Sequence, residues 1–100
     1  MLKHIVFWKI KEFAENAGKQ ENMNKIKAML EALPALIPEI KKLEVGFGCV
    51  PNPDAYDVAL YSEFEDVAAL QTYQKNPDHL KVGEFIGKVK ESRAVVDYTI

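Results

Sequence analysis

The chain is poor in cysteine, in long apolar runs and in basic charge, and each shortage excludes a class of protein. Cys49 is the only cysteine, so no disulfide can form within the chain, and a reducing cytoplasm is the expected location. No apolar run approaches the roughly 18 to 20 residues that cross a bilayer. Because Lys3, Lys9 and Lys11 interrupt the apolar N-terminal stretch, we expect neither a secretory leader nor a membrane partner.

Charge and length bear on nucleic-acid binding and on the number of domains. The 13 basic residues against 15 acidic ones leave a formal net charge of -2, so no basic surplus exists to neutralise a phosphate backbone. We therefore expect no nucleic-acid partner. One hundred residues fit one domain with a modest core, and the sequence predicts a single domain over residues 1–100.

Apolar periodicity predicts four strands separated by helices. Period-two alternation predicts strands at about residues 2–10, 43–49, 56–61 and 94–100. Helical spacing predicts helices over about 19–33, from the capping residue Asp66 to Asn76, and from Pro77 to about residue 89. The polar stretch 11–20 is predicted to be a connector.

The order of these elements indicates the fold class. Strand, helix, strand, strand, helix, strand, with one extra short helix, is typical of the ferredoxin-like or split βαβ arrangement. We therefore expect an α+β protomer of the β-α-β-β-α-β type, with a four-stranded antiparallel sheet covered on one face by helices.

The first strand predicts a homodimer. Its residues are apolar on both faces, with Val6 and Trp8 on one side and Ile5 and Phe7 on the other, which is typical of a strand buried on both sides. The helices cover only one sheet face, and a bare apolar face is an association surface. Pairing two sheets through the face that carries Ile5 and Phe7 would close a dimeric α/β barrel.

Three residues form a candidate acid–base site: Tyr73, His79 and His4. Tyr73 and His79 lie six positions apart across the Asn76-Pro77 break between two predicted helices. His4 is the only other histidine and lies in the first strand, where folding could bring all three side chains to one cavity. A neutral imidazole is favoured near a helix N-terminus, where the dipole depresses its pKa, and it is a competent general base.

Each of these residues also has a structural interpretation. His4 could be a partly buried histidine hydrogen-bonded to a neighbour, and His79 could cap or pack the first turn of its helix. Tyr73 could be a core tyrosine whose hydroxyl bonds to the backbone. The pocket around the three would have apolar, ligand-binding walls formed by five residues: Val6, Trp8, Leu30, Val82 and Ile86.

No metal or organic cofactor is expected. His4 and His79 with Asp57 or Asp78 could supply metal ligands, but the spacing of these residues matches no metal-binding pattern. The segment Gly46-Phe47-Gly48 lacks the remaining glycine of a dinucleotide-binding fingerprint and precedes no predicted helix.

Several short motifs together resemble one known family. They are His4-Ile5-Val6, Tyr56-Asp57-Val58-Ala59-Leu60, Leu70-Gln71-Thr72-Tyr73-Gln74, Pro77-Asp78-His79 and Val96-Asp97-Tyr98. In this combination the chain resembles the stress-responsive dimeric α/β-barrel (Dabb) domain over essentially its whole length. The resemblance implies a ferredoxin-like protomer, a homodimer whose sheets form a barrel, and a pocket in each protomer between sheet and helices.

Within that family the three site residues resemble those of the plant polyketide cyclases of the olivetolic acid cyclase type. The resemblance implies that His79 removes a proton α to a carbonyl while Tyr73 and His4 hold or polarise oxygens, without a metal or organic cofactor. The aromatic residues that shape the cyclase's alkyl pocket are absent, since Met23, Ile26 and Leu30 stand there. The substrate is therefore not carried over.

The candidate site and the family resemblance are compatible with two functions. The first is binding of a small, largely apolar carbonyl or phenolic ligand, with cofactor-independent proton transfer or cyclisation. The alternative is a non-catalytic, stress-associated homodimer whose histidines are structural.

Overall fold

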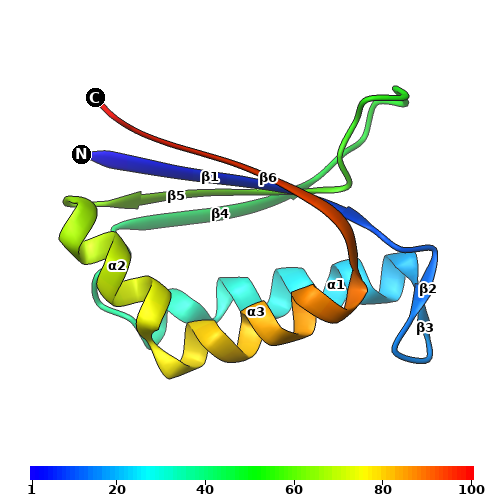
Figure 1. The fold of residues 1–100 in the computed structure, drawn as a ribbon, viewed down its shortest axis with the longest axis horizontal. Coiled ribbons are helices and arrows are strands. Elements are labelled where there is room, and N and C mark those ends of the chain that lie inside the picture. Colours follow the sequence, from blue (N-terminus) through cyan, green and yellow to red (C-terminus); the bar gives the residue numbers. More distant parts are fainter.

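The strands form one four-stranded antiparallel sheet, and all three helices lie on one of its faces (Figure 1). The computed structural model describes residues 1–100. The strand order across the sheet is β4 (Lys42–Phe47), β5 (Val58–Phe64), β1 (Leu2–Ile10) and β6 (Lys90–Thr99). The helices are α1 (Lys19–Glu31), α2 (Val67–Lys75) and α3 (Pro77–Val89). This confirms the ferredoxin-like α+β fold with its antiparallel sheet.

The break between α2 and α3 is fixed by one asparagine. Asn76 ends α2 and also caps α3, because its side-chain oxygen accepts a hydrogen bond of 2.8 Å from the backbone N–H of Asp78. Pro77 fits the first helical position because it lacks the N–H that would have no partner there. The chain therefore turns sharply between Tyr73 on one helix and His79 on the next.

Three strands have bounds that differ from those expected, and the first is β5, which spans Val58–Phe64 instead of about 56–61. Helix α3 covers the expected residues, but with 13 residues against nine in α2 it is not the short helix. Strand β6 begins at Lys90, four residues before the expected start. Strand β4 ends at Phe47, which leaves Cys49 in an exposed loop.

The chain between β1 and α1 is more ordered than a connector. It forms a small hairpin of β2 (Phe13–Ala14) and β3 (Ala17–Gly18), which the sequence did not predict. Its two turn residues, Glu15 and Asn16, have φ values of 50° and 58°, a geometry that two-residue hairpin turns require. Helix α1 ends at Glu31, two residues before the predicted end, and a short 3-10 turn, η1 (Leu33–Ala35), follows it.

Burial alternates strictly along β1. The face that carries Val6 and Trp8 is buried against the helices, whereas Ile5 and Phe7 are half-buried on the opposite face. That outer face has no helix over it (Figure 1) and also carries Val96 and Tyr98, which are 48% and 41% exposed. Within one chain the strand is thus fully buried on one side only, and its other side is the bare apolar face that the sequence predicted. None of the helices is both long and apolar enough to span a membrane.

Candidate active site

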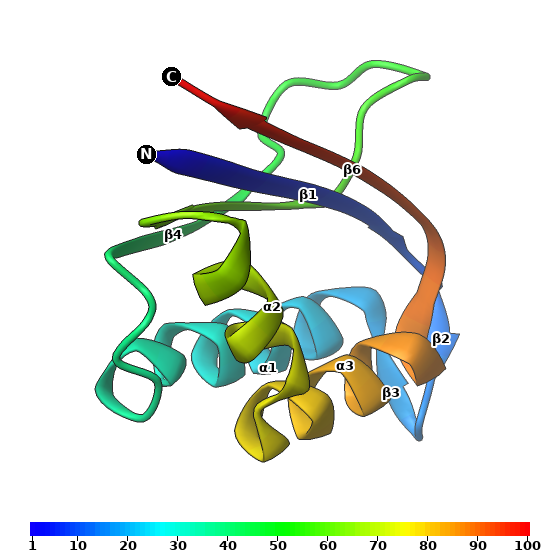
Figure 2. The same ribbon diagram turned by 60° about the vertical axis from the view of Figure 1, so that its left-hand side comes forward.

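A cavity of about 170 Å³ lies between the sheet and the helices. Helices α1 and α3 run side by side below the sheet (Figures 1 and 2). The cavity walls come from six elements: β1, β5 and β6 of the sheet, and the helices α1, α2 and α3. The lining residues are His4, Val6, Trp8, Leu30, Leu60, Tyr73, His79, Val82, Gly83, Ile86 and Arg93.

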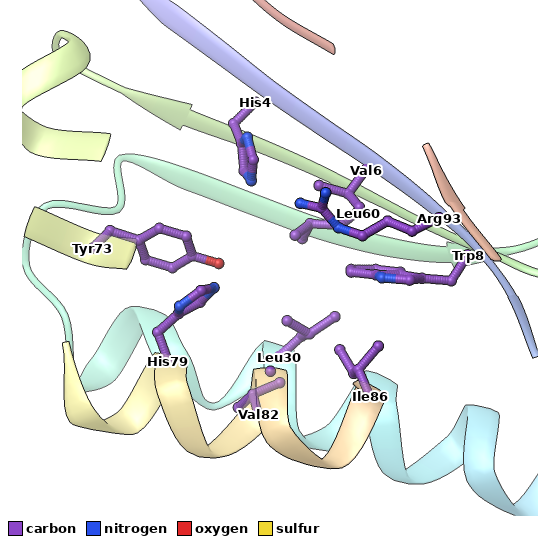
Figure 3. A pocket seen from close by; sticks show the side chains of 11 residues that line it. His4, Val6, Trp8, Leu30, Leu60, Tyr73, His79, Val82, Ile86 and Arg93 are labelled. Carbon is purple, nitrogen blue, oxygen red and sulfur yellow. The ribbon is translucent and has the colours of Figure 1, made fainter. Parts of the chain in front are cut away.

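All eight residues that the sequence placed in a pocket line this cavity (Figure 3). The three polar candidates His4, Tyr73 and His79 stand at one end, and the five predicted wall residues surround the remainder. Their shared location is a fact of the structure, whereas their chemical roles remain predictions.

The cavity meets solvent at one side. Eight of its eleven lining residues are buried, and the three that keep solvent exposure are His79, Gly83 and Arg93. These three residues therefore define the mouth. The deep end lies beyond His79, at Tyr73 and His4.

Tyr73 is the deepest polar residue and has an unsatisfied hydroxyl. Its side chain is 0% exposed and packs on Phe64, with the ring centroids 4.8 Å apart. The hydroxyl points into the cavity (Figure 3) but has no hydrogen-bond partner in the protein. Burial raises the pKa of Tyr73 well above its usual value of 10.0, so the phenol is a neutral hydrogen-bond donor at every physiological pH.

His79 has one ring nitrogen that is free to accept a proton. Its Nδ1 donates to the carbonyl oxygen of Gln74 over 3.3 Å, which leaves Nε2 as the unprotonated nitrogen of the neutral ring. Burial lowers the pKa of His79 below the usual 6.5, and nearby His4 and Arg93 lower it further, although the Gln74 bond opposes this. The sequence predicted the direction of this pKa shift, but attributed it to the helix dipole instead of desolvation.

His4 is held in one orientation by a partner from the edge strand. Its Nδ1 forms a short hydrogen bond with a carboxylate oxygen of Asp97, which faces it across the β1–β6 pair. A carboxylate only accepts, so Nδ1 carries the proton and Nε2 is left to face a ligand. The ring is 3% exposed and hangs from β1 into the cavity (Figure 3). This partner is also what the structural interpretation of His4 required.

Together these groups make the cavity suited to proton transfer on a small molecule. Tyr73 offers a donor, while the two histidines offer Nε2 acceptors, one with a lowered pKa. Proton transfer by a positioned histidine is a common catalytic device. No group of three or more His, Cys, Asp or Glu side chains is arranged to hold a metal ion.

Sequence reasoning missed two polar residues of the site, Arg93 and Asp97. Both lie on β6, in register with Trp8 and His4 respectively. The expected strand began at Ala94 and so left Arg93 outside, whereas continuing the alternation backwards from Asp97 through Val95 would have placed it on the helix-facing side. Asp97 was noted only as part of a motif, because its partner is 93 positions away.

The sequence and the fold match one protein family. The family model for the Stress responsive A/B Barrel Domain (Dabb) matches residues 2–100, and the chain belongs to this family. The solved structures that resemble it include a dimeric ferredoxin-like protein of unknown function from Bacteroides fragilis. That protein is 38% identical with a TM-score of 0.84, and the match covers 99% of this chain and 95% of the other.

Two further relatives are informative. A hydroxynitrile lyase from Passiflora edulis is 27% identical with a TM-score of 0.81, and the match covers 99% of this chain and 92% of the lyase. An uncharacterized protein of Streptomyces coelicolor is 29% identical over 101 residues, which cover 98% of each chain.

Proposed function

We propose that this Dabb protein binds a small, largely apolar molecule with a carbonyl or phenol group and moves a proton on it without a cofactor. The observation that carries the proposal is the Tyr73 hydroxyl, which is fully buried, lacks a partner in the protein and points into the cavity. A buried hydroxyl without a partner costs about 1–3 kcal/mol. A ligand oxygen that accepts its hydrogen bond would recover that free energy.

The cavity limits the size of this ligand. An apolar cavity of about 150 Å³ accepts a benzene ring, so the volume of about 170 Å³ here fits one ring or a short acyl chain with small substituents. Trp8, Leu30 and Ile86 would contact its apolar part.

In the proposed reaction, Nε2 of His79 takes a proton from a carbon next to a carbonyl. The electron pair of the broken C–H bond moves toward the carbonyl oxygen, and the Tyr73 hydroxyl donates a hydrogen bond to that oxygen as it becomes negative. Nε2 of His4, an acceptor when Nδ1 donates to Asp97 and the ring is neutral, would hold a ligand hydroxyl. The resulting enolate could then close a ring onto a second carbonyl, as the resemblance to plant polyketide cyclases implies.

The Passiflora relative supports the same class of chemistry. Cleaving a hydroxynitrile requires a base to remove the hydroxyl proton while a carbonyl forms and cyanide leaves. A histidine base beside a neutral donor suits this step as well as the removal of a proton from carbon. Both reactions require a positioned base.

A second candidate is a non-catalytic homodimer with structural histidines. The bond between His4 and Asp97 favours it, because that bond satisfies a buried imidazole without a ligand. The unsatisfied hydroxyl of Tyr73 and the acceptor nitrogen of His79 weigh against it, since neither has a structural partner.

We further propose that the protein is a homodimer joined through the outer sheet face that carries Ile5 and Phe7. The apolar residues on that face, with Val96 and Tyr98 beside them, form the surface that a second sheet would cover. The Bacteroides relative is dimeric, which supports homodimerisation. A cytoplasmic location is also proposed, since Cys49 is an exposed free thiol that suits a reducing compartment.

A ligand screen followed by one substitution tests the catalytic proposal. Phenolic, β-keto and short fatty acyl compounds are first screened for those that raise the melting temperature. With a compound that is turned over, His79→Ala should leave the free energy of unfolding within about 1 kcal/mol of wild type. It should lower turnover by roughly 10²- to 10⁴-fold, the usual share of general acid–base catalysis. Loss of stability without a specific loss of turnover would favour the structural alternative.

A further inference from the structure

We infer that the ligand of this cavity is an anion: a small aromatic or short-chain carboxylic acid whose carboxylate pairs with Arg93 at the mouth while its carbonyl or phenol oxygen reaches Tyr73. The inference rests on the proposed function and specifies the class of ligand. It is carried by the position and pairing of Arg93.

Arg93 is the only arginine among the 13 basic residues of the chain, and it lines the cavity. From β6 its side chain reaches over the mouth toward the space between His4 and Trp8 (Figure 3). The planar guanidinium fork matches a carboxylate with two parallel hydrogen bonds, which a lysine ammonium cannot do. The other cationic side chains lie outside the cavity lining.

Arg93 has no partner within the protein. It forms none of the salt bridges of the structure, although eight bring lysine or histidine side chains close to carboxylates. It also donates no side-chain hydrogen bond, and none of the eleven lining residues is acidic. Asp97, which lies on the same face of β6, is engaged by His4. The guanidinium is therefore available to a ligand.

The location at the mouth favours a carboxylate over a more highly charged group. Arg93 is exposed, so a carboxylate that binds it stays partly hydrated and avoids the cost of complete desolvation. A phosphate would need more donors than one guanidinium, and the walls behind Arg93 are mostly apolar. The apolar body of the ligand would then fill the space between Trp8, Leu30 and Ile86.

Three matched probes test the inference by calorimetric titration at fixed ionic strength. In 4-hydroxybenzoate, the phenol and the carboxylate lie at opposite ends of one ring; 4-hydroxybenzamide has the same shape without the charge; and 4-methylphenol has no polar group at that end. The wild type should bind 4-hydroxybenzoate about 10- to 100-fold more tightly than the amide, as expected for a charge-assisted bidentate contact. Arg93→Gln should abolish that preference, and Arg93→Lys should restore part of it.

Lys81→Gln is the matched control, because it removes one positive charge from an exposed site on α3 that does not line the cavity. It should keep the full preference for 4-hydroxybenzoate. If the wild type binds the neutral probes as tightly as 4-hydroxybenzoate, or if Arg93→Gln keeps the preference, the anionic ligand is wrong while ligand binding stands. If none of the three probes binds, both the anionic ligand and the proposed function are overturned.

Discussion

The imidazole of His79 packs against the phenol ring of Tyr73, with the ring centroids 4.3 Å apart, although the two residues belong to different helices. The contact is possible because Asn76 ends one helix and caps the next within a single residue. A donor and an acceptor are thus held next to each other at one end of the cavity. The sequence around Asn76 determines the contact between Tyr73 and His79, and strand β1 brings His4 to the same cavity.

The Tyr73 hydroxyl separates a ligand-binding role from a structural one. Since it has no partner in the protein, Tyr73→Phe should leave the free energy of unfolding unchanged or raise it by up to about 1 kcal/mol. The same substitution should weaken binding of a phenolic ligand. Urea denaturation and calorimetric titration measure the two effects. A loss of more than about 1 kcal/mol of stability would mean that the hydroxyl serves the folded core.

His79 makes stability depend on pH in a defined direction. Its pKa in the folded protein lies below the usual 6.5, so the unfolded chain binds a proton at a higher pH than the folded chain does. The contribution of His79 to the free energy of unfolding should therefore not change with pH above about 6.5. It should fall as the pH drops from 6.5 through the pKa of His79 in the folded protein.

Denaturation curves at several pH values measure this effect, and His79→Gln should flatten the dependence between neutral and mildly acidic pH. An NMR titration gives the pKa directly. A midpoint for His79 above 6.5 would rule out the buried, neutral base.

Gly83 allows the cavity mouth to be closed without touching a polar group. A Cβ atom at Gly83 would meet no other atom within 4 Å, and the same is true of Gly87, one helical turn further along α3. Only Gly83 lines the cavity. Gly83→Leu should abolish the rise in melting temperature that a ligand causes, whereas Gly87→Leu should keep it.

Both leucine variants should be as stable as wild type or slightly more so, because leucine has a higher helix propensity than glycine by roughly 0.5–1 kcal/mol. Equal ligand responses in the two variants would place the binding site outside this cavity.

A negative charge introduced on the outer sheet face tests whether this face forms the dimer interface. Phe7→Glu would bury an unpaired carboxylate between two sheets and should dissociate or unfold the dimer. Phe13→Glu is the control, because Phe13 is 68% exposed on the β2–β3 hairpin, away from that face. Sedimentation velocity gives the oligomeric state of both variants. A folded Phe7→Glu dimer would place the interface elsewhere.

Features that depend on residues close together in the sequence could be predicted, whereas features that depend on residues far apart in the sequence could not. The strands and the α2–α3 break depend on alternation and on Asn76 with Pro77, which are local signals. The pairing of His4 with Asp97 depends on the register between the first and last strands, which no local pattern specifies. The same holds for Arg93, whose strand begins directly after α3 without a turn signal.

The two histidines of the chain allow the central claim to be tested in one experiment. Long-range proton–nitrogen NMR spectra of the imidazoles report tautomer and ligand contact together, and His79→Gln assigns the two sets of signals. Without ligand, Nδ1 of each imidazole should carry a proton, because Asp97 and the Gln74 carbonyl accept from these nitrogens. On titration with a phenolic or β-keto compound that fits the cavity, the Nε2 signals of His4 and His79 should shift together and saturate at one affinity. If no compound of the panel moves either imidazole, the histidines are structural and the cavity is not a binding site.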